Sequence, residues 1–337
     1  MKTLRKVALV GIAAVTAFTL VACQSGGDGS NNADGGQDDG VTIETQFGPV
    51  TVPAASDDLK VVALGWSDAE VALALGVQPI AVYDWQSFGE ENKGVGPWAS
   101  ELFGDVTPTV FPNDGEAPNF EAIDALEPDL ILNLRSDNNA ETHEQLSTIA
   151  PTVAAPADTL AYSINWQTQT EIIGEALGKA EEATALISSV EETIANAAAD
   201  HPEFDGVNAA VASKFGEEYG ASFPGDARWD ILAELGFALE PKVEALTPSE
   251  GFYAPVSGEQ LGVLDTEVLV FFPIFLTLED VENDPLIAAL PVVQDGRTVF
   301  LDPDGDLVAA FSAGSPVSIP LAIEEIVPML ADAVSAR

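Results

Sequence analysis

The most informative hydrophobic pattern in the chain is a helix-to-strand unit that occurs twice. The first copy spans Phe120–Leu134, with apolar positions three residues apart behind Glu121 and then a compact apolar run. This spacing predicts a short surface helix that leads into a buried strand. The second copy spans residues 259–270 and begins with Glu259, which aligns with Glu121. Two distant copies are too few for a solenoid, and they predict two similar α/β lobes.

Apolar runs and helical spacing complete an α/β pattern in the rest of the chain. Short apolar runs predict further buried strands at Leu59–Leu64, Pro79–Tyr83, Pro151–Ala155, Val207–Ala212 and Arg297–Leu301. Helical spacing predicts further helices at Asp68–Leu75, Glu141–Ile149, Trp229–Leu235 and Pro316–Ala333. Strands that alternate with helices in this way favour mostly parallel central sheets with right-handed crossovers.

Local signals predict the less regular segments. Thr42–Val52 is expected to pair as a small hairpin, and the Ser67 side chain is expected to cap the N-terminus of the helix that follows it. Residues 89–116 are rich in Gly and Pro, so a loop over the open end of the first lobe is expected there. A polar, aromatic loop is expected directly after Ala212.

A long helical pattern separates the two halves. Apolar residues recur at helical spacing from residue 165 to residue 199, with Gly174 and Gly178 as candidate division points. The part from Lys179 onwards would be about 30 Å long at roughly 1.5 Å per residue, enough to cross between lobes. The sequence therefore predicts a first lobe at 41–164, a connecting helix at 165–200 and a second lobe at 201–337.

The N-terminus has the pattern of an exported lipoprotein. Lys2, Arg5 and Lys6 precede an apolar run that is too short to span a membrane, which predicts a signal peptide at residues 1–22. Residues 20–23 resemble the bacterial lipobox, and this implies lipid on Cys23, the only cysteine in the chain. Two acyl chains would anchor the protein stably to a membrane surface. Residues 23–40 are rich in Gly, Ser, Asn and Asp and predict a flexible tether.

The chain is strongly acidic. It has 12 Lys and Arg residues against 55 Asp and Glu residues, for a formal net charge of −43. Such a field repels nucleic acid and anionic lipid headgroups, so neither is an expected partner. It keeps the protein soluble and identifies no ligand, and we expect a monomer.

The order and spacing of several motifs resemble one family. These motifs are the Cys23 lipobox, Val61–Trp66 with Ala72–Gly76, Phe120–Leu132, Gln145–Val153, Trp166 with Ile173–Gly178, Glu259–Phe272, Pro285–Leu301 and Ser315–Pro320. Together they resemble the substrate-binding lipoproteins of ferric-siderophore and cobalamin ABC importers. The resemblance implies two α/β lobes joined by one rigid helix, with a ligand cleft between them. It also implies that Glu121 and Glu259 dock on arginines of the membrane permease. The alternative is that both are ordinary solvated first-turn glutamates.

Candidate ligand-binding residues follow the predicted strands, because clefts in such sheets open at the carboxyl ends of strands. Aromatic faces and a few cations suit a bulky metal chelate. The candidates are Trp66, Tyr83, Trp85 and Arg135 in the first lobe, and Lys214, Tyr219, Arg228 and Phe272 in the second. For any single aromatic residue, packing in the core or at the rim is the alternative. Arg135 is the strongest candidate, because basic residues are scarce.

The expected ligand is a ferric siderophore, with a neutral or cationic hydroxamate favoured because the overall field opposes anionic ligands. Cobalamin and haem remain alternatives, and haem would draw a ligand from Tyr83, Tyr162, Tyr219 or Tyr253. A surface lipoprotein that binds another small solute or a protein partner is a further alternative.

An enzyme is not expected. The chain lacks a Gly-x-Ser-x-Gly elbow, a phosphate-binding Gly-rich loop with Lys, and a His-Glu-x-x-His motif. Its two histidines, His143 and His201, are too few for a typical transition-metal site. No catalytic residue, cofactor or resident metal is therefore predicted.

Overall fold

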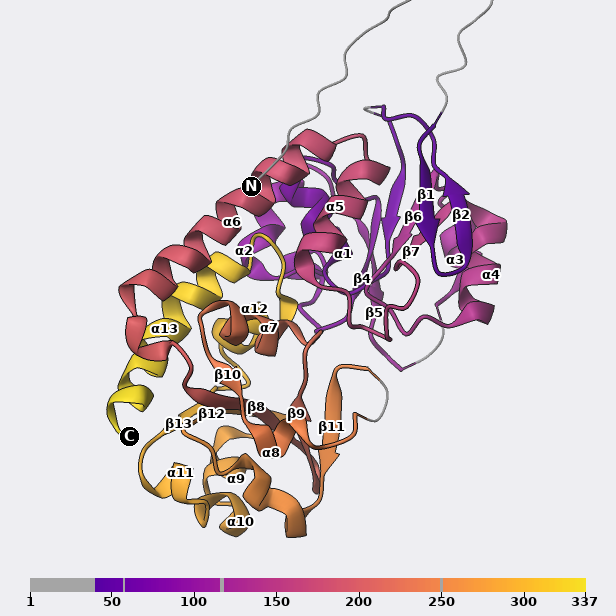
Figure 1. Cartoon of the computed structure of the whole chain (residues 1–337). Coiled ribbons are helices and arrows are strands. Elements are labelled where there is room, and N and C mark those ends of the chain that lie inside the picture. The colour runs from indigo at the N-terminus through magenta and orange to yellow at the C-terminus, as the bar shows by residue number, and fades with distance from the viewer. Residues whose placement is uncertain (1–39, 57, 116–117, 249–250) are drawn as a thin grey trace, which may run out of the picture. The chain divides into compact units, whose positions relative to one another are not determined.

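The computed structural model describes residues 40–337, apart from residues 57, 116–117 and 249–250 (Figure 1). The predicted signal peptide, Cys23 and nearly all of the predicted tether lie outside the described residues. Among the described residues, none of the helices combines the length and the apolar character that crossing a membrane requires.

The first lobe is built on a five-stranded, fully parallel sheet in the order β5-β4-β3-β6-β7. Its strands are β3 (Val61–Ala63), β4 (Ala81–Asp84), β5 (Thr109–Pro112), β6 (Leu130–Asn133) and β7 (Thr152–Ala154). Helices α1 (Asp68–Ala74) and α5 (Trp166–Ala176) pack on one face, and α3 (Phe120–Asp124) and α4 (Ala140–Ile149) pack on the other. Since successive side chains point to opposite faces and both faces are covered, the central strands β3 and β6 are buried along their whole length.

The expected loop at 89–116 is more structured than the sequence predicts. It contains η1 (Glu90–Asn92), α2 (Pro97–Ser100), η2 (Glu101–Phe103) and the edge strand β5. The prediction misses β5 because an edge strand is half exposed and lacks a continuous apolar run. The N-terminal hairpin is confirmed as β1 (Thr42–Thr45) and β2 (Gly48–Thr51), which pair antiparallel.

The second lobe is built on a mixed sheet in the order β11-β9-β8-β12-β13, with β10 also paired to β8. Its strands are β8 (Asn208–Phe215), β9 (Glu218–Ser222), β10 (Ala238–Leu239), β11 (Tyr253–Val256), β12 (Val268–Ile274) and β13 (Thr298–Phe300). Strands β10, β8, β12 and β13 pair parallel, whereas β9 pairs antiparallel with both of its neighbours, β8 and β11. The loop predicted after Ala212 is therefore wrong: β8 continues to Phe215 and turns back into β9.

Two layers of helices cover the second sheet. Helices α7 (Ala227–Glu234), α12 (Asp306–Ala313) and α13 (Ile319–Ser335) pack on one face. The opposite face is covered by short elements: α8 (Pro241–Glu244), η4 (Gly258–Leu264), α9 (Leu278–Glu282), α10 (Pro285–Ala288) and α11 (Pro291–Gln294). The short turn η3 (Pro202–Phe204) leads into this lobe.

Helix α6 (Ala180–Asp200) contacts the cores of both lobes. Ala183 packs in the first core, whereas Ile187, Val190 and Ile194 pack in the second. Figure 1 shows α6 beside α13, and the two helices are in contact. Gly178, with φ +67°, separates α5 from α6, as only glycine readily adopts this conformation. A helix of this length spans about 30 Å.

The two copies of the sequence repeat occupy equivalent places. Unit α3–β6 places β6 beside β3, and unit η4–β12 places β12 beside β8. Asp129 precedes β6 and accepts a hydrogen bond from the Lys60 backbone N–H at 2.9 Å. Glu267 precedes β12 and accepts one from the Asn208 backbone N–H at 2.9 Å. The second helix is 3₁₀ rather than α, which fits its two glycines, Gly258 and Gly262.

Candidate functional site

The carboxyl ends of the first-lobe strands surround a cavity of about 530 Å³, which we call the strand-end cavity. Three residues predicted from the sequence, Trp66, Tyr83 and Arg135, line it. Phe111 in β5 and Tyr162 in the segment after β7 join them. Parallel strands end at one edge of a sheet, which explains why residues from distant parts of the chain meet here.

Trp66 and Tyr162 line this cavity as members of an aromatic stack, whose other members, Trp85 and Phe252, lie outside the lining. The Trp66 ring stacks on Trp85 at a centroid distance of 4.5 Å and on Tyr162 at 4.2 Å. Phe252, from the second lobe, meets Trp66 and Tyr162 edge to face, at 6.2 Å in each case. Tyr162 has φ +57°, an uncommon backbone conformation for a residue other than glycine. The stack presents a broad apolar surface with a defined orientation.

Arg135 lines the same cavity and is only 5% exposed. Its guanidinium carbon is 5.9 Å from the Trp66 ring centroid. Its Nη1 donates to the Ala313 carbonyl at 2.8 Å, and its Nε lies 3.4 Å from the Tyr162 carbonyl. Burial lowers the Arg135 pKa to about 10, so the side chain stays cationic at neutral pH. Among the described residues, no carboxylate forms an ion pair with it within 4.0 Å.

The other charged groups that line the strand-end cavity are acidic. Asp114 and Asp137 contribute carboxylates, and Arg135 is the only basic residue among the described lining residues. The Tyr162 pKa is raised to about 12, mainly by burial and to a lesser extent by the nearby Asp137 and Tyr83. Burial and the nearby Asp114 also raise the Tyr83 pKa. Both phenols are therefore protonated at neutral pH.

The second-lobe candidates lie on two opposite faces of the sheet. Lys214 forms an ion pair with Asp284, and the Tyr219 hydroxyl donates to the same carboxylate at 2.6 Å. Burial would raise the Asp284 pKa, but the hydrogen bonds from Lys214 and Tyr219 outweigh this effect and lower it. On the other face, the Arg228 guanidinium carbon lies 4.7 Å from the Phe272 ring centroid.

The structure thus does not bring these four predicted residues into one cluster. Lys214 is neutralised by Asp284, and Arg228 is neutralised by Asp226, to which both Nε and Nη2 donate. Their opposite orientation follows from the two-residue period of strands β8 and β12. Their role in ligand binding stays a prediction, and their main observed contacts are with the protein itself.

A different pair of second-lobe aromatics is exposed at the carboxyl ends of β8 and β12. Phe275 is 89% exposed, and its ring meets Phe215 edge to face at 5.7 Å. Phe275 also has φ +54°, which is uncommon outside glycine. The sequence places both residues after strands but cannot separate them from buried aromatics, because exposure depends on the neighbouring elements. Their exposure makes them further candidate ligand contacts.

Glu121 and Glu259 are exposed and occupy matching positions. Each is the second residue after the N-cap of its helix, which is Asn119 for α3 and Ser257 for η4. Both side chains are therefore accessible to a partner, as the docking prediction requires. The geometry is equally compatible with solvated first-turn glutamates, and the docking role stays a prediction.

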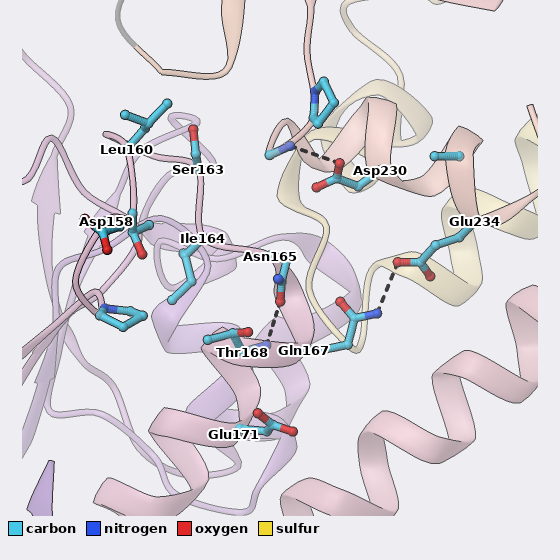
Figure 2. Close-up of a pocket in the computed structure, with 15 residues that line it drawn as sticks. Asp158, Leu160, Ser163, Ile164, Asn165, Gln167, Thr168, Glu171, Asp230 and Glu234 are labelled. Atoms are coloured by element: carbon cyan, nitrogen blue, oxygen red, sulfur yellow. Dashed lines mark hydrogen bonds between the residues drawn. The ribbon is translucent and has the colours of Figure 1, made fainter. Parts of the chain in front are cut away.

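A second hollow, which we call the acidic groove, has a volume of about 780 Å³ and lies between the segment leading into α5 and helix α7 (Figure 2). Its carboxylates come from Asp158, Glu171, Asp230 and Glu234. Burial, with repulsion from nearby carboxylates, raises the Asp230 pKa to about 6. Asp230 accepts from the Gly225 backbone at 3.0 Å, and Glu234 accepts from Gln167 at 3.1 Å. These bonds give both carboxylates a structural role.

No metal centre is found in the part of the chain that the structure describes. No group of three or more His, Cys, Asp or Glu side chains there is arranged to hold a metal ion.

The family model described as periplasmic binding protein matches residues 61–304. The chain therefore belongs to the periplasmic binding protein family, whose members are solute-binding proteins that act outside the cytoplasm. This assignment agrees with two lobes joined by α6 and a cavity at strand ends.

Named relatives cover most of the chain. It is 24% identical to the Fe(3+)-citrate-binding protein YfmC of Bacillus subtilis, over 88% of this chain and 90% of that protein. It is 26% identical to the probable siderophore-binding lipoprotein YfiY of the same organism, over 80% and 79% of the two chains. Among solved structures, PiaA from Streptococcus pneumoniae in complex with ferrichrome is similar with a TM-score of 0.75. That match has 25% identity and covers 88% of this chain and 99% of PiaA.

Proposed function

We propose that this protein captures a ferric siderophore outside the cytoplasm and delivers it to an ABC permease for iron uptake. The strand-end cavity carries the proposal: aromatic faces surround one buried cation, Arg135, which has no carboxylate ion-pair partner among the described residues. A metal chelate with apolar linkers and oxygen-rich coordination fits such a surface. Relatives that bind ferric citrate, siderophores and ferrichrome support the same ligand class.

Within this class, a ferric hydroxamate is the favoured ligand. A ferric complex of three hydroxamate groups is neutral overall, whereas a ferric tris-catecholate is strongly anionic. The cavity offers one arginine beside Asp114 and Asp137, and the chain has a formal net charge of −43. Coulomb repulsion therefore opposes a highly anionic chelate. One guanidinium is sufficient to hydrogen-bond the partly negative oxygens of a neutral chelate.

We propose that the protein has no catalytic activity and is held at the membrane by lipid on Cys23. The lipobox at residues 20–23 and the lipoprotein relative YfiY support the anchor. Metabolic labelling with an alkyne fatty acid should label the full-length protein but not Cys23→Ala. Equal labelling of both proteins would exclude this anchor.

The ligand proposal is tested by tryptophan fluorescence, because Trp66 lines the cavity and Trp85 stacks on Trp66. The tether-free protein is titrated with ferrichrome, a ferric tris-catecholate, ferric citrate, cobalamin and haemin, each beside its metal-free form where one exists. N-acetyltryptophanamide controls for absorption by the ligands. Saturable quenching by ferrichrome at sub-micromolar concentration supports a hydroxamate. Tight binding of the catecholate alone refutes the hydroxamate, and flat titrations with all five refute the siderophore function.

A further inference from the structure

Three side chains of the first lobe donate to backbone carbonyls of helix α12 in the second lobe. Arg135 Nη1 donates to the Ala313 carbonyl at 2.8 Å, and the Ser67 hydroxyl donates to the same oxygen at 2.9 Å. Gln86 Nε2, which follows β4, donates to the Ala309 carbonyl at 3.2 Å. Ala313 is the last residue of α12, where a helix has unsatisfied acceptors and a partial negative charge, whereas Ala309 lies in the middle of the helix.

Ser67 illustrates how specific this contact is. The sequence predicts that its side chain caps α1, but the structure shows no such bond. Ser67 has φ +61°, and its hydroxyl points instead to Ala313 in the other lobe. The prediction of a side-chain cap is wrong because the hydroxyl has a distant partner that local sequence does not reveal.

Arg135 differs from Ser67 and Gln86 because it also lines the strand-end cavity. The lining of this cavity includes no residue of α12, so Arg135 is a direct physical connection between the cavity and that helix. A guanidinium has five N–H donors in a rigid plane. Nη1 is used by Ala313 and Nε lies near the Tyr162 carbonyl, which leaves further donors for a ligand.

We infer that Arg135 couples ligand occupancy of the strand-end cavity to the contact between the lobes, by capping α12 and holding the ligand with the same guanidinium. A ligand that engages the remaining N–H groups immobilises the side chain in the orientation that caps α12. The capped arrangement of the lobes is then favoured when ligand is bound, by differential affinity for the two arrangements. This inference rests on the proposed function, because it assumes a ligand in this cavity.

Hydrogen exchange measured by mass spectrometry on peptides covering residues 306–318 tests the coupling, with ferrichrome as the probe. In the wild-type protein, saturating ferrichrome should slow exchange in these peptides, although none of these residues lines the cavity. Arg135→Lys should abolish this slowing, because a compact ammonium cannot serve the ligand and Ala313 together. Ferrichrome affinity should also fall by about 10- to 100-fold, the range for losing hydrogen bonds to a charged group.

Ser67→Ala is the matched control, because it removes a donor from the same carbonyl without touching the cavity. It should speed exchange in the ligand-free protein but retain the ligand-dependent slowing. The inference is overturned if saturating ferrichrome slows hydrogen exchange equally in wild type and Arg135→Lys. It is also overturned if wild type binds ferrichrome but its exchange over residues 306–318 does not slow.

A failure of the proposed function has a different signature. If wild type shows no fluorescence response to ferrichrome, the ligand assignment fails, and the ligand-free comparison still tests the contact. Arg135→Lys and Arg135→Gln should then both exchange faster than wild type over residues 306–318. If exchange is unchanged in both variants, the hydrogen bond from Arg135 to the Ala313 carbonyl does not stabilise α12, and the inference fails.

Discussion

Asp68 is a buried carboxylate that links the segments carrying two cavity residues, and the pH dependence of stability tests its protonation. The carboxylate is fully buried in α1 and accepts from the Leu134 backbone at 2.8 Å and from Gln169 Nε2 at 2.6 Å. Gln169 also donates to the Trp66 carbonyl at 2.8 Å. Asp68 thereby holds together the segments that carry Trp66 and Arg135. Its pKa is nevertheless raised to about 6, because the desolvation caused by burial exceeds the effect of these hydrogen bonds.

The sign of the pH effect follows from this shift. The folded protein holds the Asp68 proton more tightly than the unfolded chain, whose pKa for this group is near 3.8. The contribution of Asp68 to the free energy of unfolding therefore falls as the pH rises from about 4 to about 6.5, and then levels off. The difference between a pKa of 3.8 and one of about 6 corresponds to about 3 kcal/mol of stability. Asp68→Asn removes this titration, so the wild-type advantage over the variant should shrink by about that amount as the pH rises.

Urea unfolding of both proteins at about pH 3.5, 4.5, 5.5, 6.5 and 7.5, values that bracket the window of about 4 to 6.5, measures this difference at constant ionic strength. Ser67→Ala removes no titratable group, so its difference from wild type should stay constant over the same range. Subtracting each variant from wild type cancels the contributions of other carboxylates, including the buried Glu70. A difference between wild type and Asp68→Asn that is constant, or that grows with pH, would falsify the assignment of a raised pKa to Asp68.

Three further predictions concern the second lobe and the exposed glutamates. Lys214→Ala leaves the buried Asp284 without its cation and should lower the free energy of unfolding by about 3 to 5 kcal/mol in urea, whereas a loss under 1 kcal/mol contradicts a strong pair. Phe275→Ala should change stability by less than about 0.5 kcal/mol, since the ring is exposed, yet weaken ferrichrome binding; unchanged affinity in a fluorescence titration removes it from the site. Replacing both Glu121 and Glu259 by Ala should abolish uptake by cells while ligand binding in vitro stays intact. Loss of ligand binding in this double variant would refute a role limited to docking.

The sequence predicted the spatial grouping of its candidate residues better in the first lobe than in the second. In the first lobe the sheet is fully parallel, so Trp66, Tyr83 and Arg135 meet at one edge as the strand order implies. In the second lobe the loop expected after Ala212 is the hairpin β8–β9. The sequence showed no strong strand signal there, because Gly216 and flanking polar residues interrupt the apolar pattern.

The amino-acid sequence by itself determined the alternation of helices and strands, the paired lobes and the helical segment between them. These features arise from hydrophobic periodicity and turn residues, which act over a few neighbouring positions. The repeat with Glu121 and Glu259 belongs to the same category, since its helix and strand are read from one short segment. The parallel sheet of the first lobe follows from the same local signals, because each strand is linked to the next by a crossover.

Only the tertiary structure decided which partners the functional candidates meet. Arg135 bonds to Ala313, 178 residues away, and Ser67 reaches the same carbonyl over 246 residues. Lys214 pairs with Asp284 across 70 residues. Such contacts leave no periodic signal in the sequence, because they depend on how distant elements pack and on which buried polar groups need partners.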